Sequence, residues 1–151
     1  MIDEHLRLTL ANRLDALEPA RQAMAAYLAP AELSPKVVFK LELVVEETFM
    51  NLLWHAFQDD AEHIIELTVQ LRPDEVVLSF EDDGIAFDPT QAAEPARPAS
   101  IDDEPVGGRG LALVRRAARS VVYVRAGGRN RLQVLIARDS CVAPPPGSGD
   151  R

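Results

Sequence analysis

The spacing of hydrophobic and polar positions predicts a strand and two helices in the first part of the chain. Between His5 and Ala11 leucines alternate with polar residues, which is the period of a half-buried strand. From Leu14 to Leu28 apolar residues recur at helical spacing, and Pro30 ends the pattern. A longer helical pattern runs to about Phe57 and begins at Ser34, which is a good N-cap residue.

The second half of the pattern predicts two hairpins and one further helix. Segments rich in Ile, Val, Leu and Phe are separated by the short turn sequence Arg72-Pro73-Asp74, and a similar pair of segments surrounds Gly127-Gly128. Strands are therefore expected at 62–71, 75–81, 121–125 and 131–137, and a helix at 111–118.

The order of these elements predicts an α/β (α+β) two-layer sandwich, with helices on one face of a mixed, mostly antiparallel sheet. The length of 151 residues suits one domain, which we expect to span 1–140. Residues 88–106 carry four prolines and predict an irregular connection, and we expect a lid over about 88–110. The remaining residues, 141–151, are rich in Pro, Gly and Ser and predict a disordered tail.

Charge and cysteine usage narrow the function classes. The net charge of -8 and the pI near 4.8 argue against direct binding of nucleic acid or of an anionic membrane surface. A nucleotide remains possible, because backbone amides and a metal ion can hold phosphates in an acidic protein. The single cysteine, Cys141, allows no internal disulfide, and neither a signal peptide nor a membrane-spanning apolar run is apparent, so we expect a cytoplasmic protein.

Three side chains on the long predicted helix form one stripe. Glu47, Asn51 and His55 are four residues apart, so the stripe drifts by only about 40° per step. Glu47 and Asn51 fall at the rim of the apolar face, whereas Glu46 projects toward solvent. A carboxylate at the rim could orient or deprotonate a hydroxyl, and an amide oxygen one turn on could hold Mg²⁺. The alternative is a solvated acidic face with a structural asparagine.

A second candidate site lies at the end of the strand predicted at 75–81. By the two-residue period Asp82 follows the buried row of side chains, while Asp83 points the other way. A carboxylate in that position needs a strong hydrogen-bond donor, and the exocyclic amine of adenine is a suitable one. Gly84 then permits close approach of the backbone. A plain Asp-Asp-Gly turn is the alternative.

The third candidate is a glycine-rich run directly before the helix predicted at 111–118. Gly107, Gly108 and Gly110 would offer bare amides to an anion, and Arg109 could add a positive charge at the terminal phosphate. The alternative is a flexible hinge.

Taken together and in this order, the three motifs resemble the N, G1 and G2 boxes of the GHKL ATPase superfamily. The closer resemblance is to its small stand-alone branch, the bacterial anti-sigma-factor serine kinases, and it covers about residues 6–138. The matching residues are Glu47, Asn51 and His55 on the long helix, then Asp82, Gly84, Phe87, Asp88 and Pro89, and finally the runs 108–115 and 128–132.

This resemblance implies an ATP- and Mg²⁺-dependent serine/threonine protein kinase that acts as a partner-switching regulator. It would phosphorylate a STAS-type anti-anti-sigma protein, sequester a sigma factor and form a homodimer through its first strand and helix. The implied roles are general base for Glu47, Mg²⁺ ligand for Asn51 and adenine acceptor for Asp82. Gly84 and Ala86 would border the nucleotide, and the run Gly108, Arg109, Gly110 and Leu111 would form the phosphate lid.

The chain also departs from the pattern of that superfamily. Ala86 stands where the second glycine of the G1 box is usual, and Met50 replaces a threonine common before the asparagine. These departures keep a second hypothesis open, namely a catalytically inactive module that binds a nucleotide, or none, and regulates by docking alone. The ATP-binding piece of a sensor histidine kinase is a weaker alternative, because we expect no room in the chain for a helical hairpin that bears a phosphoacceptor histidine.

Overall fold

The computed structural model describes residues 5–57, 59–86 and 108–138 and, within these, gives no side chains for 108–111. Residues 88–107 of the lid expected over about 88–110 lie outside these ranges, as does the expected tail at 141–151. The strands are β1 (His5–Ala11), β2 (Ile64–Leu71), β3 (Glu75–Asp82), β4 (Ser120–Ala126) and β5 (Arg129–Ala137), and the α-helices are α1 (Leu17–Leu28), α2 (Pro35–His55) and α3 (Gly108–Ala117). Short 3₁₀ turns at Leu14–Ala16 and Ala29–Ala31 flank α1.

The five strands form one sheet in the order β1-β2-β3-β5-β4, and all the pairings between them are antiparallel. Both hairpins are present where the turn sequences predicted them. The turn between β4 and β5 is tight, because Gly127 and Gly128 both have positive φ angles, of 60° and 75°. Such a turn matches the twist of the strands that it joins, so the ladder continues to Ala126 and Arg129.

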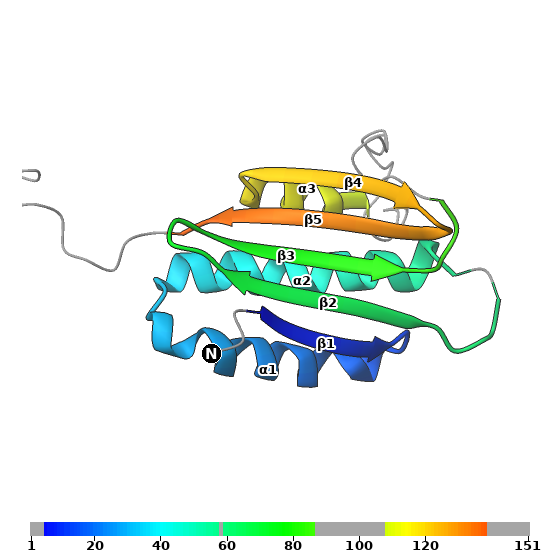
Figure 1. Cartoon of the computed structure of the whole chain (residues 1–151), viewed down its shortest axis with the longest axis horizontal. Coiled ribbons are helices and arrows are strands. Elements are labelled where there is room, and N and C mark those ends of the chain that lie inside the picture. The colour runs from blue at the N-terminus through cyan, green and yellow to red at the C-terminus, as the bar shows by residue number, and fades with distance from the viewer. Residues whose placement is uncertain (1–4, 58, 87–107, 139–151) are drawn as a thin grey trace, which may run out of the picture.

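The helices cover one face of this sheet, which confirms the predicted two-layer sandwich (Figure 1). In this view α3 lies behind β4 and β5, and α2 lies behind β3 and β2. Ser34 caps α2 as its sequence predicted, because its Oγ accepts a hydrogen bond of 3.2 Å from the backbone N–H of Val37. No helix within the described ranges combines the length and the apolar character needed to cross a membrane.

The core lies between the helices and the sheet. Its fully buried side chains come from α2 and from the inward-facing positions of β2, β3 and β5, and the largest are Leu41, Phe49, Ile65, Leu67, Leu78, Phe80 and Ile136. Burying such side chains supplies most of the stabilisation of a domain of this size. The core therefore joins α2, which carries Glu47 and Asn51, to β3, which carries Asp82.

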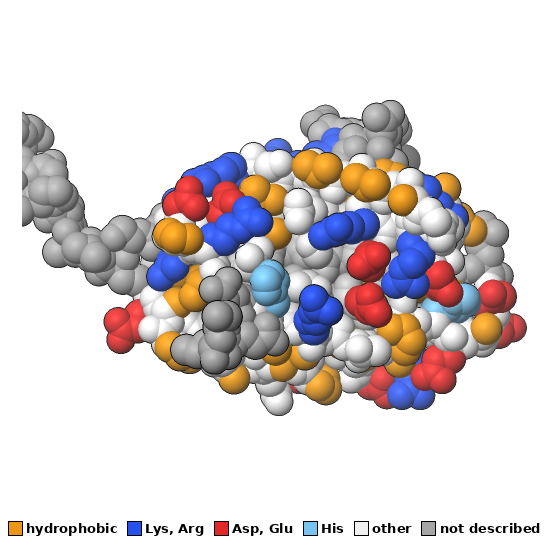
Figure 2. All heavy atoms as spheres, viewed as in Figure 1, with side chains coloured by type: hydrophobic (Ala, Val, Ile, Leu, Met, Phe, Trp, Pro, Cys, Tyr) orange, Lys and Arg blue, Asp and Glu red, His pale blue; other side chains and the backbone are white. Residues whose placement is uncertain are grey.

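The other face of the sheet is open to solvent (Figure 2). Lys and Arg side chains stand beside Asp and Glu side chains over its middle, and apolar side chains follow β4, where Val122 and Val124 are exposed. Arg129 lies 3.6 Å from both Glu66 and Glu81 and joins β2, β3 and β5 across this face. An antiparallel sheet commonly leaves one face to water in this way.

Candidate functional site

Helix α2 presents Glu47 and Asn51 as the helical spacing predicted. Glu46 is exposed, Glu47 is half-buried and Asn51 is buried, with only 4% of its surface exposed. The third residue of the stripe, His55, is exposed at the last turn of the helix. Of the two glutamates, Glu47 is thus the one that can face a partly desolvated site and still be accessible to a ligand from solvent.

Asn51 carries the clearest mark of a ligand position. Its Oδ1 is buried and has no hydrogen-bond partner among the described residues, and the same holds for the Oγ1 of Thr48, three residues earlier. A buried polar atom without a partner costs about 1–3 kcal/mol, so such atoms are rare unless something else satisfies them. An amide oxygen is a suitable ligand for Mg²⁺, which usually takes one or two protein ligands together with phosphate oxygens and water. The residue therefore fits the metal that the sequence implied.

The surroundings of Glu47 favour its protonated form. Burial raises the pKa of Glu47 above its ordinary value of 4.5, and the neighbouring charge of Glu46 raises it further. A carboxylate with a raised pKa is a stronger base than an ordinary glutamate at the surface. The position and the pKa both suit a group that accepts a proton from a hydroxyl.

Asp82 ends the buried row of β3, as the two-residue period predicted. Only 1% of its surface is exposed, whereas Asp83 is exposed. Its Oδ1 accepts a hydrogen bond of 2.8 Å from the backbone N–H of Gly84 and one of 2.9 Å from the Nδ2 of Asn130. The carboxylate is therefore held in a fixed orientation at the end of the sheet.

Gly84 joins the end of β3 to the end of α2. The backbone N–H of Ile85 donates to the carbonyl oxygen of Ala56 at 2.9 Å. A Cβ atom on Gly84 would lie 2.8 Å from Asp82 Oδ1 and would collide with the Ala56 carbonyl oxygen. Only glycine allows this approach of strand to helix, and Ala86 two residues later is exposed.

Replacing Gly84 with alanine is expected to lower the free energy of unfolding by about 1–3 kcal/mol, because the new methyl group forces Ala56 and Asp82 to move. The displacement of Asp82 should also weaken binding of Mg-ADP, as measured by calorimetry. Gly128→Ala is the matched control, since a Cβ there meets no atom within 4 Å but the φ of 75° costs about 1–2 kcal/mol. Equal losses of Mg-ADP affinity in the two variants would contradict this account.

The glycine-rich run differs from its predicted position. We expected Gly108 and Gly110 to precede a helix that starts at Leu111, but α3 already starts at Gly108, so that Gly108, Arg109, Gly110 and Leu111 all lie in its first turn. The backbone N–H groups of a first turn have no partner within the helix, so this placement keeps amides available to an anion. Gly107 lies outside the described residues. Helix α3 packs against α2, which carries Glu47 and Asn51.

Three residues around Asp82 received no role from the sequence, although Asn130 lies in the run 128–132 that contributed to the resemblance. Asn130 is 4% exposed and lies directly opposite Asp82 in the pairing of β3 with β5, and Arg125 lies opposite Asn130 on β4. Tyr123, two residues before Arg125, donates a hydrogen bond from its hydroxyl to Asn130 Oδ1. The signal was present in the chain, because Asn130 precedes the buried positions Leu132, Val134 and Ile136 at the same two-residue period that selected Asp82.

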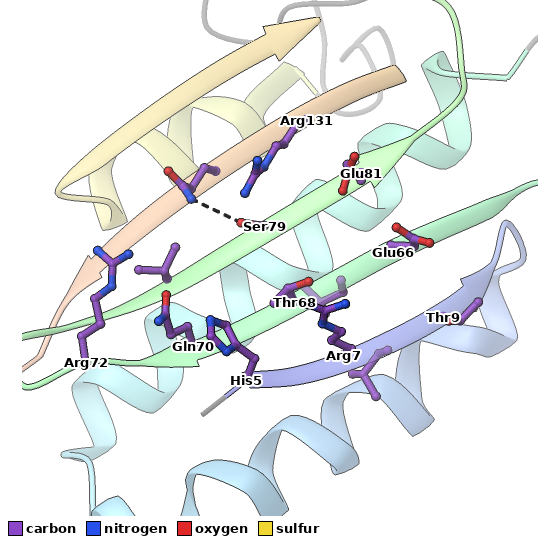
Figure 3. Close-up of a pocket in the computed structure, with 14 residues that line it drawn as sticks. His5, Arg7, Thr9, Glu66, Thr68, Gln70, Arg72, Ser79, Glu81 and Arg131 are labelled. Carbon is purple, nitrogen blue, oxygen red and sulfur yellow. Dashed lines mark hydrogen bonds between the residues drawn. The ribbon is translucent and has the colours of Figure 1, made fainter. Parts of the chain in front are cut away.

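Two hollows of similar size lie at different places on the described part of the molecule. One, of about 410 Å³, lies on the open face among polar side chains such as Arg7, Thr68, Ser79 and Arg131 (Figure 3). None of the predicted site residues lines it. The other, of about 420 Å³, is lined by Ala56, Phe57, Asp59, His63, Asp83, Gly84, Ile85 and Arg125. The second hollow borders the Asp82-Gly84 turn, and Gly84 is the one predicted site residue among the residues that line it.

His63 forms a charged cluster beside this second hollow. Its Nε2 lies 2.7 Å from Asp59 Oδ1, its Nδ1 lies 3.0 Å from Asp83 Oδ1, and its ring stacks on Phe57 with the centroids 4.6 Å apart. The hydrogen bond to Asp59 and, after it, the one to Asp83 raise the pKa of His63 above 6.5. The cluster links the end of α2 to the start of β2 and to the start of the segment that follows β3.

We expect this cluster to make stability depend on pH. A raised pKa in the folded state means that His63 contributes stability below about pH 6.5 and that this contribution is lost as the pH rises through the folded-state value. His63→Phe keeps a ring on Phe57 but removes the charge. In urea titrations, the loss of unfolding free energy caused by this substitution should be larger at about pH 6 than at about pH 8.5. A loss of the same size at both pH values would show that the charge is irrelevant.

The fold and the candidate site fit the class of two-layer α/β domains that bind a nucleotide on the helical side of an antiparallel sheet. Residues 10–136 match the family described as the histidine kinase-like ATPase domain. The chain belongs to that family. This confirms the family inferred from the three motifs.

A relative of known activity supports the same branch of the family. The serine/threonine-protein kinase BtrW of Bordetella bronchiseptica is 38% identical over 99 residues, which cover 66% of this chain and 70% of BtrW. The activity in the name of BtrW agrees with the serine-kinase branch that the motifs resemble.

Solved structures support the fold. The RsbU and RsbW domains of Rv1364c from Mycobacterium tuberculosis superpose with a TM-score of 0.64 at 15% identity, over 91% of this chain and 34% of that one. The blue-light activated histidine kinase of Erythrobacter litoralis superposes with a TM-score of 0.50 at 21% identity, over 70% of this chain and 31% of that one. This chain thus spans about a third of the length of these two solved chains.

Proposed function

We propose that this protein is an ATP- and Mg²⁺-dependent serine/threonine protein kinase that works as an anti-sigma-factor regulator by switching between partners. The observation that carries the proposal is the arrangement on α2, where half-buried Glu47 lies one turn from Asn51, whose buried Oδ1 has no partner within the described part of the chain. Membership of the histidine kinase-like ATPase family and the similarity to the kinase BtrW support it.

Each residue of the candidate site has a proposed role. Asp82 would accept a hydrogen bond from the exocyclic amine of adenine, Asn51 would hold Mg²⁺, and the first turn of α3 would bind phosphate through its backbone amides. Bound Mg²⁺ neutralises charge on the phosphates. Glu47 would accept the proton of the substrate hydroxyl as the hydroxyl oxygen attacks the γ-phosphorus of ATP, and the bond from that phosphorus to the bridging oxygen would break so that ADP leaves. In this scheme the chain contributes mainly by positioning the reactants.

The proposed partners follow from the branch of the family that the motifs resemble. The phosphorylated protein would be a STAS-type anti-anti-sigma protein, and the sequestered protein a sigma factor. We also propose a homodimer formed through β1 and α1. The position of β1 at an edge of the sheet supports this, because one side of the strand is not paired with any described residue. Light scattering on the purified protein tests the dimer.

Incubation with Mg-ATP and candidate STAS proteins tests the proposed kinase activity. We expect one STAS protein to gain a phosphate on a serine or threonine, detected by mass spectrometry of the tryptic peptides. Omitting Mg²⁺ should abolish the reaction. Tight binding of Mg-ATP without transfer to any partner would instead favour the docking-only module, which the alanine at position 86 keeps open.

A further inference from the structure

A row of three polar side chains crosses the sheet at the adenine end of the candidate site. Asp82 on β3, Asn130 on β5 and Arg125 on β4 are direct partners in the ladder, so their side chains share one face. This is the face that the helices cover. Two of the three side chains are almost completely buried, which is costly unless their polar atoms are satisfied.

The hydrogen bonds of Asn130 fix the orientation of its amide. Its Nδ2 donates to Asp82 Oδ1 at 2.9 Å and to the carbonyl oxygen of Ile85 at 2.8 Å, with the carbonyl oxygen of Gly84 at 3.4 Å. Its Oδ1 accepts from the hydroxyl of Tyr123 and, at 3.1 Å, from Arg125 Nη1. A flipped amide would place its donors against these donors and its acceptor against a carboxylate, so a single orientation is possible.

This fixed amide determines which oxygen of Asp82 stays available. Both hydrogen bonds to the carboxylate, from Asn130 and from the backbone of Gly84, go to Oδ1. Among the described residues none donates to Oδ2. The arrangement orients the carboxylate from one side and leaves its second oxygen as an acceptor.

Arg125 supports the same arrangement from outside. Its Nη1 donates to the carbonyl oxygen of Gly84 at 2.7 Å as well as to Asn130. Asn130 and Arg125 therefore both hold the Gly84-Ile85 backbone, which follows Asp82 and packs on the end of α2. The positions of the Asp82 carboxylate and of this backbone therefore depend on the same hydrogen-bond network.

We propose that Asn130 is a positioning residue for adenine recognition, acting through Asp82, with Tyr123 and Arg125 as its supports. The inference rests on the proposed nucleotide site. It adds that the preference of this site for a 6-amino purine is determined by an asparagine on β5 that itself does not touch the base.

Comparison of two nucleotides separates positioning from general stability. ADP carries the exocyclic amine that Asp82 would accept, and purine riboside 5′-diphosphate lacks it. The affinities of both, each with Mg²⁺, are measured by calorimetry on the full-length protein. The variants are Asn130→Ala and Tyr123→Phe, the latter of which removes only the hydroxyl donor to Asn130. Gln133→Ala is the control, because Gln133 lies on the same strand and lines the hollow on the open face.

Wild type is expected to bind ADP at least about tenfold more tightly than purine riboside diphosphate, as one hydrogen bond to a charged acceptor allows. Asn130→Ala should reduce this ratio of affinities to about threefold or less, because it weakens the binding of ADP and not that of purine riboside diphosphate. Tyr123→Phe should reduce it partly, in a protein whose circular dichroism and melting temperature match wild type. Gln133→Ala should leave it unchanged.

The outcomes distinguish this inference from the proposed function. If wild type binds neither nucleotide, the proposed function fails and the inference fails with it. If wild type prefers ADP and Asn130→Ala and Tyr123→Phe keep the full preference, the inference alone is wrong. If Asn130→Ala weakens the binding of both nucleotides equally, Asn130 has a merely structural role and the inference is again overturned. Should Asn130→Ala not fold, the ratio in Tyr123→Phe decides.

Discussion

Replacing Glu47 with glutamine is expected to lower the rate of phosphotransfer to a protein substrate by about 10²–10⁴-fold, which is the usual contribution of a positioned general base. Glutamine keeps the size of the side chain and cannot take up a proton. Binding of Mg-ATP should stay near the wild-type value, since the proposed contacts to the nucleotide come from other residues. Single-turnover transfer of labelled phosphate, with calorimetry for binding, measures the two effects separately.

Glu46→Gln is the matched control for this prediction. Glu46 is the adjacent residue on the same helix but is exposed, so its own carboxylate should not be needed for transfer. A loss as large in Glu46→Gln as in Glu47→Gln would show that the general charge of the helix matters and not the position of one base.

The pH dependence of transfer gives a further check on the same carboxylate. The pKa of Glu47 is raised above 4.5, so the rate should fall as the pH drops through a value above that of an ordinary glutamate. Glu46 contributes to this rise after burial. Glu46→Gln should therefore move the acid limb of the profile to lower pH, whereas a limb that does not move would assign it to another group.

The sequence predicts a residue's place well where that place depends only on the periodicity of one helix or strand. The helical angle distinguished Glu47 from Glu46, and the two-residue period of a strand distinguished Asp82 from Asp83. Both rules depend only on which side of one element faces the core. The core itself is apolar and continuous along α2 and β3, so the rules held.

Residues whose position depends on a turn were predicted less well. The last strand was expected to start at Arg131, but the two positive φ angles at Gly127 and Gly128 make the turn so tight that pairing already begins at Arg129. Asn130 thereby enters the ladder opposite Asp82. Helix α3 also starts earlier than expected, at Gly108 and not at Leu111, although glycine in a helix costs about 1 kcal/mol per residue relative to alanine.

The His63 cluster shows a different limit of sequence-based prediction. Its hydrogen bonds join residues 4 and 20 positions apart across the end of the sheet. Asp59 and His63 have the four-residue spacing of a helical pair but lie between α2 and β2, outside any helix, and no period relates His63 to Asp83. Only the antiparallel pairing of β2 with β3 brings His63 to Asp83, so the cluster could not be predicted before the register of the sheet was known.

Asp82→Asn is expected to weaken binding of Mg-ATP by about tenfold to a hundredfold, by removing the acceptor for the adenine amine. The two donors already bound to Oδ1, from Gly84 and Asn130, require the amide oxygen of the new asparagine to take that place. Its amide nitrogen must then occupy the position of Oδ2, where it would meet the adenine amine donor against donor. Calorimetry with ATP and purine riboside triphosphate measures the loss, which should be confined to ATP.

Asp83→Asn is the control that separates adenine recognition from the loss of one negative charge. Both variants change the net charge equally and lie next to each other, but Asp83 is exposed and bonds to His63. Its affinity for Mg-ATP should therefore equal that of wild type. If Asp83→Asn loses as much affinity as Asp82→Asn, the nucleotide lies on the other side of this turn, and the assignment of Asp82 as the adenine acceptor is wrong.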